Sequence, residues 1–153
     1  MEARTREILQ NVLEMKDIGN SFYKDKLYAD AEAAYSGALH CLDEDKTGHP
    51  EIRALTLTLL SNRAQSSICQ GYYEEALISC DEALTMDPKH PKVLYRRGVA
   101  HAKLGHREEV EGCAEMLRTI GCQKEAEELL SLAPATMDDL EYFLYRMFLY
   151  RMS

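Results

Sequence analysis

Apolar residues recur along this chain at spacings of three and four, as in helices that bury one face. Leu, Ala, Glu, Lys and Met are abundant, whereas the alternating runs of Val, Ile and Thr typical of strands are almost absent. The pattern therefore predicts an all-α chain without strands. We expect helices at about 3–24, 27–43, 50–70, 73–86, 90–104, 107–119 and 125–133.

Composition fits one soluble domain of 153 residues with a formal net charge of −8. The chain has no basic stripe, so we do not expect it to bind nucleic acid. It also has no apolar run long enough for a signal peptide or a membrane span. The cysteines are odd in number, lack a C-x-x-C motif and occupy apolar periodic positions. They indicate reduced core thiols and a cytoplasmic protein: Cys41, Cys69, Cys80, Cys113 and Cys122.

Two consecutive segments of the chain, 57–90 and 91–124, align with an offset of 34 residues. The positions that match are small residues, which allow helices to approach closely: Ala64 with Gly98, Gly71 with Gly105, and Ala76 with Val110. The same frame, started at Val12, places Gly19, Ala31 and Ala38 at the small positions. This first unit is 11 residues longer, and the polar stretch DEDKTGHPEIR holds the extra residues. Within it, Pro50 is suited to open a lengthened helix.

This repeat resembles the tetratricopeptide repeat, a helix-turn-helix unit of 34 residues. The resemblance implies a right-handed superhelix of three repeats, at about 12–56 with the 11-residue insertion, 57–90 and 91–124, followed by a capping helix at 125–133. Together they form a repeat domain over residues 1–135. The third unit departs most from the family pattern, because Val110 and Ala114 replace the expected Ala and aromatic residue.

The first helix of each unit lines the concave groove in this family, and polar residues gather on these helices. Lys92 and Arg96 are four residues apart and share a face, whereas Arg97 turns aside. The whole set resembles the carboxylate clamp of chaperone-binding repeat domains. The resemblance implies an adaptor or co-chaperone that binds the C-terminal Glu-Glu-Val-Asp of seventy- or ninety-kilodalton heat-shock chaperones, through Lys16, Asn20, Asn62, Lys92 and Arg96.

A clamp of this kind needs donors for two neighbouring carboxylates, the terminal one and the side chain of the last Asp. Lys and Arg supply charge, and Asn supplies directed neutral donors. By the resemblance, Lys16, Asn20 and Asn62 hold the terminal carboxylate, while Lys92 and Arg96 hold the Asp side chain.

Secondary peptide contacts are expected at positions further along the groove. Tyr23, Gln65, Ile68 and Lys103 stand there and would select between the two chaperones. Tyr23 and Ile68 are equally consistent with core positions between helices, because apolar residues at helical spacing usually belong to the core. The preferred chaperone is therefore left open, as is an alternative in which the groove binds an internal peptide or the chain's own tail.

Catalytic and metal signatures are missing from the sequence. None of the five histidines stands at zinc-ligand spacing, and His101 and His106 would lie on different faces of a helix. No esterase, nucleotide or dinucleotide motif occurs, and nothing in the repeat frame activates Cys69 or Cys80 as a nucleophile. We therefore expect a protein that is not an enzyme and that uses neither metal nor cofactor. Whether it is a whole adaptor or a fragment is left open.

The tail at 136–153 falls outside the repeat. It contains FLYRM twice, at 143–147 and 148–152, and a period of five distributes apolar residues all round a helix. Thr136 or Asp138 would cap this helix. Three roles are open: packing on the last repeat, self-association into a homo-oligomer, and contact with a membrane surface. The third is disfavoured, because Arg146 and Arg151 are few cations for an anionic-lipid anchor.

Overall fold

The computed structural model describes residues 2–43 and 48–152, which form eight α-helices and contain no strand. The predicted all-α class is therefore confirmed for this part of the chain, and the seven predicted helices agree with the structure to within two residues at each end. The helices are α1 (Ala3–Lys24), α2 (Tyr28–Asp43), α3 (Pro50–Gln70), α4 (Tyr73–Met86), α5 (Pro91–Lys103), α6 (Arg107–Thr119), α7 (Gln123–Leu132) and α8 (Met137–Met152).

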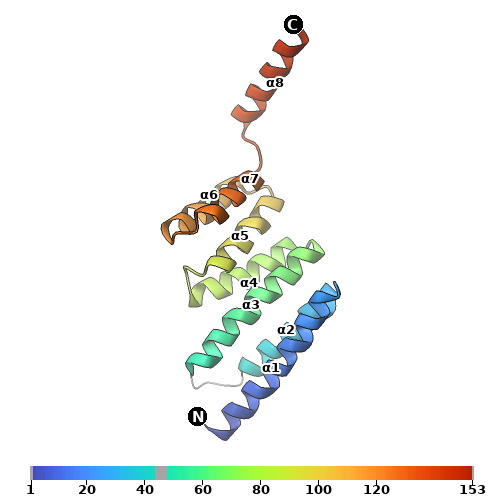
Figure 1. Ribbon diagram of the computed structural model, residues 1–153, viewed down its shortest axis with the longest axis vertical. Helices are drawn as coiled ribbons and strands as arrows, with labels where there is room; N and C mark the ends of the chain where they lie inside the picture. Colours follow the sequence, from blue (N-terminus) through green and yellow to red (C-terminus); the bar gives the residue numbers. More distant parts are fainter. Residues whose placement is uncertain (1, 44–47, 153) are drawn as a thin grey trace.

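The helices α1 to α7 form a stack that follows the chain from one end to the other (Figure 1). Each of the helices α1 to α6 packs against the next helix in sequence. In addition, α1 contacts α3, α3 contacts α5, and α5 contacts α7. The odd-numbered helices therefore lie side by side and form one continuous surface of the stack, which is the surface that carries the predicted binding residues.

Glycine and proline set the boundaries of these helices. Gly71 and Gly105 have φ of +80° and +79°, a left-handed conformation that residues with a Cβ rarely adopt, and they end the first helix of two successive pairs. At the other end, Pro50 and Pro91 occupy the first turn of α3 and α5. The expectation that Pro50 opens a lengthened helix is confirmed, since α3 begins there. Residues 44–47 of the insertion lie outside the described part of the chain.

Two apolar clusters form the core of the stack, one spanning α1 to α5 and one spanning α5 to α7. Leu84 packs against both clusters and joins them. Close helix packing explains the small residues of the repeat frame. At Gly98, for example, an added Cβ would lie 2.5 Å from Cδ1 of Leu129 on α7.

The expectation that all five cysteines are core thiols is wrong for three of them. Cys80 and Cys113 are buried as predicted, but Cys41 and Cys122 are only half-buried and Cys69 is exposed. Cys69 lies in the last turn of α3, just before the helix ends at the Gly71 turn. It stands four residues after the half-buried Gln65 and so lies on the same open face of α3, while Ser66 and Ser67 of this turn are buried.

Of the three roles considered for the tail, packing on the last repeat is contradicted by the structure. In Figure 1, α8 extends away from the stack, no other described helix packs against it, and none of its described residues is buried. The reason is that α7 already closes the stack: it buries Ala126 and Leu129 inward and exposes polar side chains outward. No described helix is long and apolar enough to cross a membrane.

Only the beginning of α8 is attached to the stack. Thr136 caps the helix, as predicted, because its Oγ1 accepts a hydrogen bond from the Asp139 amide at 3.0 Å while the Asp139 carboxylate accepts one from the Thr136 amide at 2.9 Å. Arg107 on α6 donates to the carbonyl of Pro134 at 2.5 Å and lies 3.7 Å from the Asp139 carboxylate. These contacts hold the base of α8 beside α6.

Candidate functional site

Three adjoining cavities, of about 110, 350 and 440 Å³, lie along the surface of the odd-numbered helices. The smallest and the middle one share Arg96, the middle and the largest share Lys92, and the largest and the smallest share Asn62. They therefore form one concave region, and α7 contributes Glu125 at its far side. Asn20 lines the smallest cavity. Lys16 lines none of the three; it is half-buried, one helical turn before Asn20 on α1.

Asn20 is held by two hydrogen bonds to its side-chain oxygen. The hydroxyl of Tyr35 donates to Oδ1 of Asn20 at 2.7 Å, and Nδ2 of Asn62 donates to the same oxygen at 3.5 Å. This fixes the direction of the Asn20 amide group. Since its oxygen is occupied by two donors, the group that Asn20 offers to a ligand is its NH₂, which suits an anion.

The role of Tyr35 beside Asn20 was not predicted from the sequence. Its ring is 2% exposed and packs against Gly19, where an added Cβ would lie 2.6 Å from Cε1 of the ring. The glycine thus lets the ring approach α1 closely enough for its hydroxyl to reach Asn20. In the sequence, only the residue type points to this role: the hydroxyl of a buried Tyr usually forms a hydrogen bond.

Arg96 is half-buried and is held by the helix beside it. Nη1 donates to the backbone carbonyl of Ser61 at 2.6 Å and also to the Ser61 hydroxyl. Burial lowers the pKa of the Arg96 guanidinium from its ordinary value, although an arginine stays charged at neutral pH. By contrast, the neighbouring Arg97 turns aside, as expected, and pairs with Asp81 at 2.8 Å.

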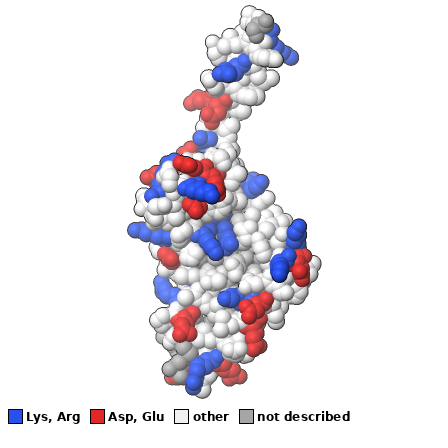
Figure 2. All heavy atoms as spheres, in the orientation of Figure 1, with Lys and Arg blue, Asp and Glu red and all other residues white. Residues whose placement is uncertain are grey.

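The cations of the groove have no carboxylate partner among the described residues. Lys16, Lys92 and Arg96 take part in none of the ion pairs there, whereas Arg63, Arg97, Arg107 and Arg118 each pair with Asp or Glu. Figure 2 shows both signs of charge interspersed over the face in view. In a chain of net charge −8, unpaired cations around one concavity provide a local site for an anion.

Two of the four predicted secondary contacts line the concave region. Tyr23 and Gln65 border both the smallest and the middle cavity. Tyr23 belongs to the core as well, since its ring packs against the first apolar cluster and burial raises the pKa of its hydroxyl. Ile68 is half-buried and Lys103 is exposed, and neither lines the cavities described above.

Tyr95 and Glu125 also border the middle cavity, and sequence reasoning missed both. Tyr95 directly precedes Arg96, but adjacent residues on a helix usually point in different directions, so spacing gave no reason to include it. Glu125 belongs to α7, which the repeat frame treats only as a cap. Its approach to the groove depends on how α7 packs against α5.

The residues weighed for catalysis lie elsewhere. Cys80 is fully buried, and burial raises the pKa of its thiol to about 12, so it stays neutral. His101 and His106 do face each other, with their Nδ1 atoms 3.0 Å apart, contrary to the expectation of different faces. The reason is that α5 ends at Lys103, so His106 lies beyond the Gly105 turn. Within the described residues, no three His, Cys, Asp or Glu side chains are grouped to hold a metal ion.

Comparison with known proteins gives relatives for most of the chain. No family model matches it. The "Hsp70/Hsp90 co-chaperone CNS1" of Saccharomyces cerevisiae is 33% identical over 113 residues, which are 74% of this chain and 27% of that protein. A solved structure of this co-chaperone superposes with a TM-score of 0.74 at 26% identity, covering 95% of this chain and 44% of that one. This chain spans less than a third of the length of the curated relatives it first matches.

A second structural neighbour contains a bound peptide. The second TPR domain of human RPAP3, solved in complex with the HSP70 peptide SGPTIEEVD, superposes with a TM-score of 0.67 at 28% identity. The match covers 81% of this chain and 95% of that domain. Similarity thus extends over the helix stack that carries the concave region.

Proposed function

We propose that this chain, which belongs to the tetratricopeptide-repeat family and has its all-α superhelical fold, is a co-chaperone docking domain. Its ligand would be the acidic C-terminal tail, ending in Glu-Glu-Val-Asp, of a seventy- or ninety-kilodalton heat-shock chaperone. The observation that carries the proposal is the convergence of Asn20, Asn62, Lys92 and Arg96 on adjoining cavities, where the two cations have no carboxylate partner within the described part of the chain. Similarity to a repeat domain solved with a chaperone peptide supports it.

The proposed clamp divides two carboxylates between two sets of donors. Lys16, Asn20 and Asn62 take the free C-terminal carboxylate, for which the Asn20 NH₂ is already oriented by Tyr35. Lys92 and Arg96 take the side chain of the last Asp. Charge-assisted hydrogen bonds contribute about 1.5–3 kcal/mol each before the costs of association. A short peptide held in this way should bind with micromolar affinity, about −8 kcal/mol.

The residues before the terminal Asp would lie against the middle cavity. Tyr23 and Gln65 provide its wall and are the stronger candidates for secondary contacts, while Ile68 and Lys103 would need a longer peptide to be reached. We further propose that the domain acts by binding and not by catalysis, and that it works in the cytoplasm.

Calorimetric titration of two peptides tests the proposal. Both end in Glu-Glu-Val-Asp, one with a free C-terminus and one amidated. We expect micromolar binding of the free peptide, and binding at least about tenfold weaker for the amide, because the loss of one charge-assisted contact removes roughly 1.5 kcal/mol or more. Lys92→Ala should lower the affinity by a similar factor, since Lys92 lines two cavities and is exposed.

Lys89→Ala is the matched control for Lys92→Ala. It removes the same charge three residues away, at an exposed turn position that lines none of the three cavities, so the affinity should stay unchanged. Arg96→Ala is a less clean test, because Arg96 also joins α5 to Ser61 on α3. Equal affinity for the two peptides, or no binding of either, would reject the clamp and leave a repeat scaffold for an internal peptide.

A further inference from the structure

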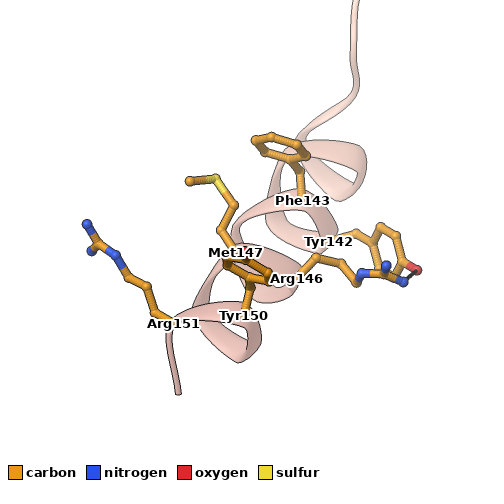
Figure 3. A pocket seen from close by; sticks show the side chains of 6 residues that line it. All are labelled: Tyr142, Phe143, Arg146, Met147, Tyr150 and Arg151. Carbon is orange, nitrogen blue, oxygen red and sulfur yellow. Dashed lines mark hydrogen bonds between the residues drawn. The ribbon is translucent and has the colours of Figure 1, made fainter. Parts of the chain in front are cut away.

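Enclosure distinguishes the middle cavity of the groove from the hollow along α8. The hollow measures about 580 Å³, and side chains of α8 alone line it, projecting outward from the helix (Figure 3). No other described helix packs against α8, so the hollow has no second wall within this part of the chain. The middle cavity, by contrast, has walls from α1, α3, α5 and α7. The groove therefore encloses a ligand residue from several sides.

The middle cavity has walls of opposite charge. On one side α5 contributes Lys92 and Arg96, and α7 contributes the carboxylate of Glu125. All three side chains line the same space of about 350 Å³. A groove that is proposed to receive an acidic peptide thus contains an acidic residue of its own.

The packing of α7 on α5 brings Glu125 to this wall. Gly98 on α5 lets Leu129 of α7 approach closely, since an added Cβ would lie 2.5 Å from its Cδ1. Leu129 is four residues after Glu125 and therefore lies on the same face of α7. The face of α7 that buries Leu129 against α5 thus carries Glu125 one turn earlier, at the edge of the cavity.

Two aromatic rings, those of Tyr23 on α1 and Tyr95 on α5, also line the cavity. Burial raises the pKa of the Tyr95 hydroxyl, and the carboxylates of Glu128 and Glu125 raise it further. Tyr95 therefore lies beside the acidic side of α7. A carboxylate close to aromatic rings is a favourable environment for a cation.

Glu125 is not neutralised by the protein. It takes part in no ion pair among the described residues, although two cations line the same cavity. Its charge therefore acts on the ligand residue that enters the cavity. Glu127 on the same helix differs, because it is exposed, accepts a hydrogen bond from Gln123 at 3.1 Å and lines none of the three cavities of the groove.

Docking of the ligand's last Asp would sharpen the effect of Glu125. In the proposed clamp that side chain pairs with Lys92 and Arg96, so these cations no longer offset Glu125 as strongly. A second acidic side chain in the middle cavity would then be repelled by Glu125. A basic side chain would instead be attracted by Glu125 and would contact the tyrosine rings. Unfavourable contacts with the wrong ligand are a common source of specificity.

We propose that Glu125 is a specificity-determining residue of the groove, which selects a basic side chain at one position upstream of the acidic end of the ligand. The inference rests on the proposed function, because it assigns the middle cavity to residues before the terminal Asp. It defines the chemistry of the ligand more closely: the tail is acidic at its last residues and carries Lys or Arg a few residues earlier. A tail that is acidic throughout binds less tightly.

Calorimetric titration of a peptide series tests this selection. The parent peptide is SGPTIEEVD with a free C-terminus, and each residue before Val is changed in turn to Lys and to Glu. At one position, wild type should bind the Lys peptide about fivefold more tightly than the Glu peptide, as expected for one exposed charge contact. Glu125→Gln should abolish this preference, and Glu125→Lys should reverse it at the same position.

Glu127→Lys is the matched control for Glu125→Lys. It makes the same change of charge on α7, but two residues along, so it lies on nearly the opposite side of the helix. The preference at every peptide position should stay as in wild type. Both side chains are exposed, so both variants should retain the helix stack, which circular dichroism checks.

The outcomes separate this inference from the proposed clamp. If wild type binds the parent peptide but Glu125→Lys reverses the preference at no position, the inference is overturned and the clamp stands. An equal reversal in Glu127→Lys would overturn it too, because the effect would then come from the net charge of α7. If wild type binds none of the peptides, the clamp is rejected and the selection by Glu125 is rejected with it.

Discussion

Tyr35 connects the core of the helix stack to the candidate binding site. Its ring is buried among α1, α2 and α3, and its hydroxyl reaches Oδ1 of Asn20 at 2.7 Å. A rigid core residue thus orients an exposed amide that has one further hydrogen bond, from Asn62. Such support matters because an amide free to rotate would present its oxygen to a carboxylate as readily as its NH₂.

The substitution Tyr35→Phe tests this hydrogen bond, because it removes the hydroxyl and keeps the ring. We expect the free energy of unfolding to fall by about 1 kcal/mol, the net value of one hydrogen bond, and the affinity for the Glu-Glu-Val-Asp peptide to fall by about fivefold. Urea denaturation and calorimetry measure the two effects. An unchanged peptide affinity in a folded Tyr35→Phe variant would show that Asn20 needs no orienting partner.

Where local spacing sets the direction of a side chain, the sequence predicted which residues share a surface, while their role in binding stays a prediction. Lys92 and Arg96 are one turn apart on one helix, and both line the middle cavity. The contact of Tyr35 with Asn20 could not be predicted, because it depends on how close α1 and α2 approach and on a side-chain rotamer. Ile68 and Lys103 were placed in the groove by family resemblance, and the cavities do not include them.

At the scale of helices, two glycines in helix interiors have opposite surroundings. Gly19 on α1 faces the Tyr35 ring, whereas an added Cβ at Gly112 on α6 would meet nothing within 4 Å. The first glycine is required by the close approach of two helices. The second has no packing role, so it only lowers the helix propensity of α6.

Alanine at these two positions should therefore have opposite effects. Gly19→Ala forces the Tyr35 ring away from α1 and should lower the free energy of unfolding by about 1–3 kcal/mol, with weaker peptide binding as a second effect. Gly112→Ala should raise the free energy of unfolding by about 0.5–1 kcal/mol. Chemical denaturation of both variants checks this, and equal effects would show that the backbone near Gly19 yields to the added methyl group.

Helix boundaries were predictable because glycine and proline act locally, as at Gly71 and Pro50. The position of α8 was not, because it depends on whether α7 leaves an apolar face uncovered. The division into repeat units at 12–56, 57–90 and 91–124, with the cap at 125–133 and the tail at 136–153, stays a prediction.

At the scale of the whole molecule, an acidic chain is proposed to bind an acidic peptide. The net charge of −8 repels the peptide at long range, while the cations of the groove attract it at contact. Physiological salt screens exposed charges beyond roughly 8–10 Å, so the contact dominates.

Raising the salt concentration should therefore weaken peptide binding, because it screens the contacts with Lys16 and Lys92 at the groove. Calorimetry in increasing sodium chloride measures the slope, and Lys92→Ala should make that slope shallower. An affinity that rises with salt would mean that the long-range repulsion outweighs the clamp.

The separation of α8 from the helix stack has a consequence for valency. Because no other described helix packs on α8, a peptide in the groove and a surface in contact with the tail would occupy the molecule independently. Binding at one of them would not compete with binding at the other. A partner that engaged both would be held with an avidity above the affinity of either contact alone.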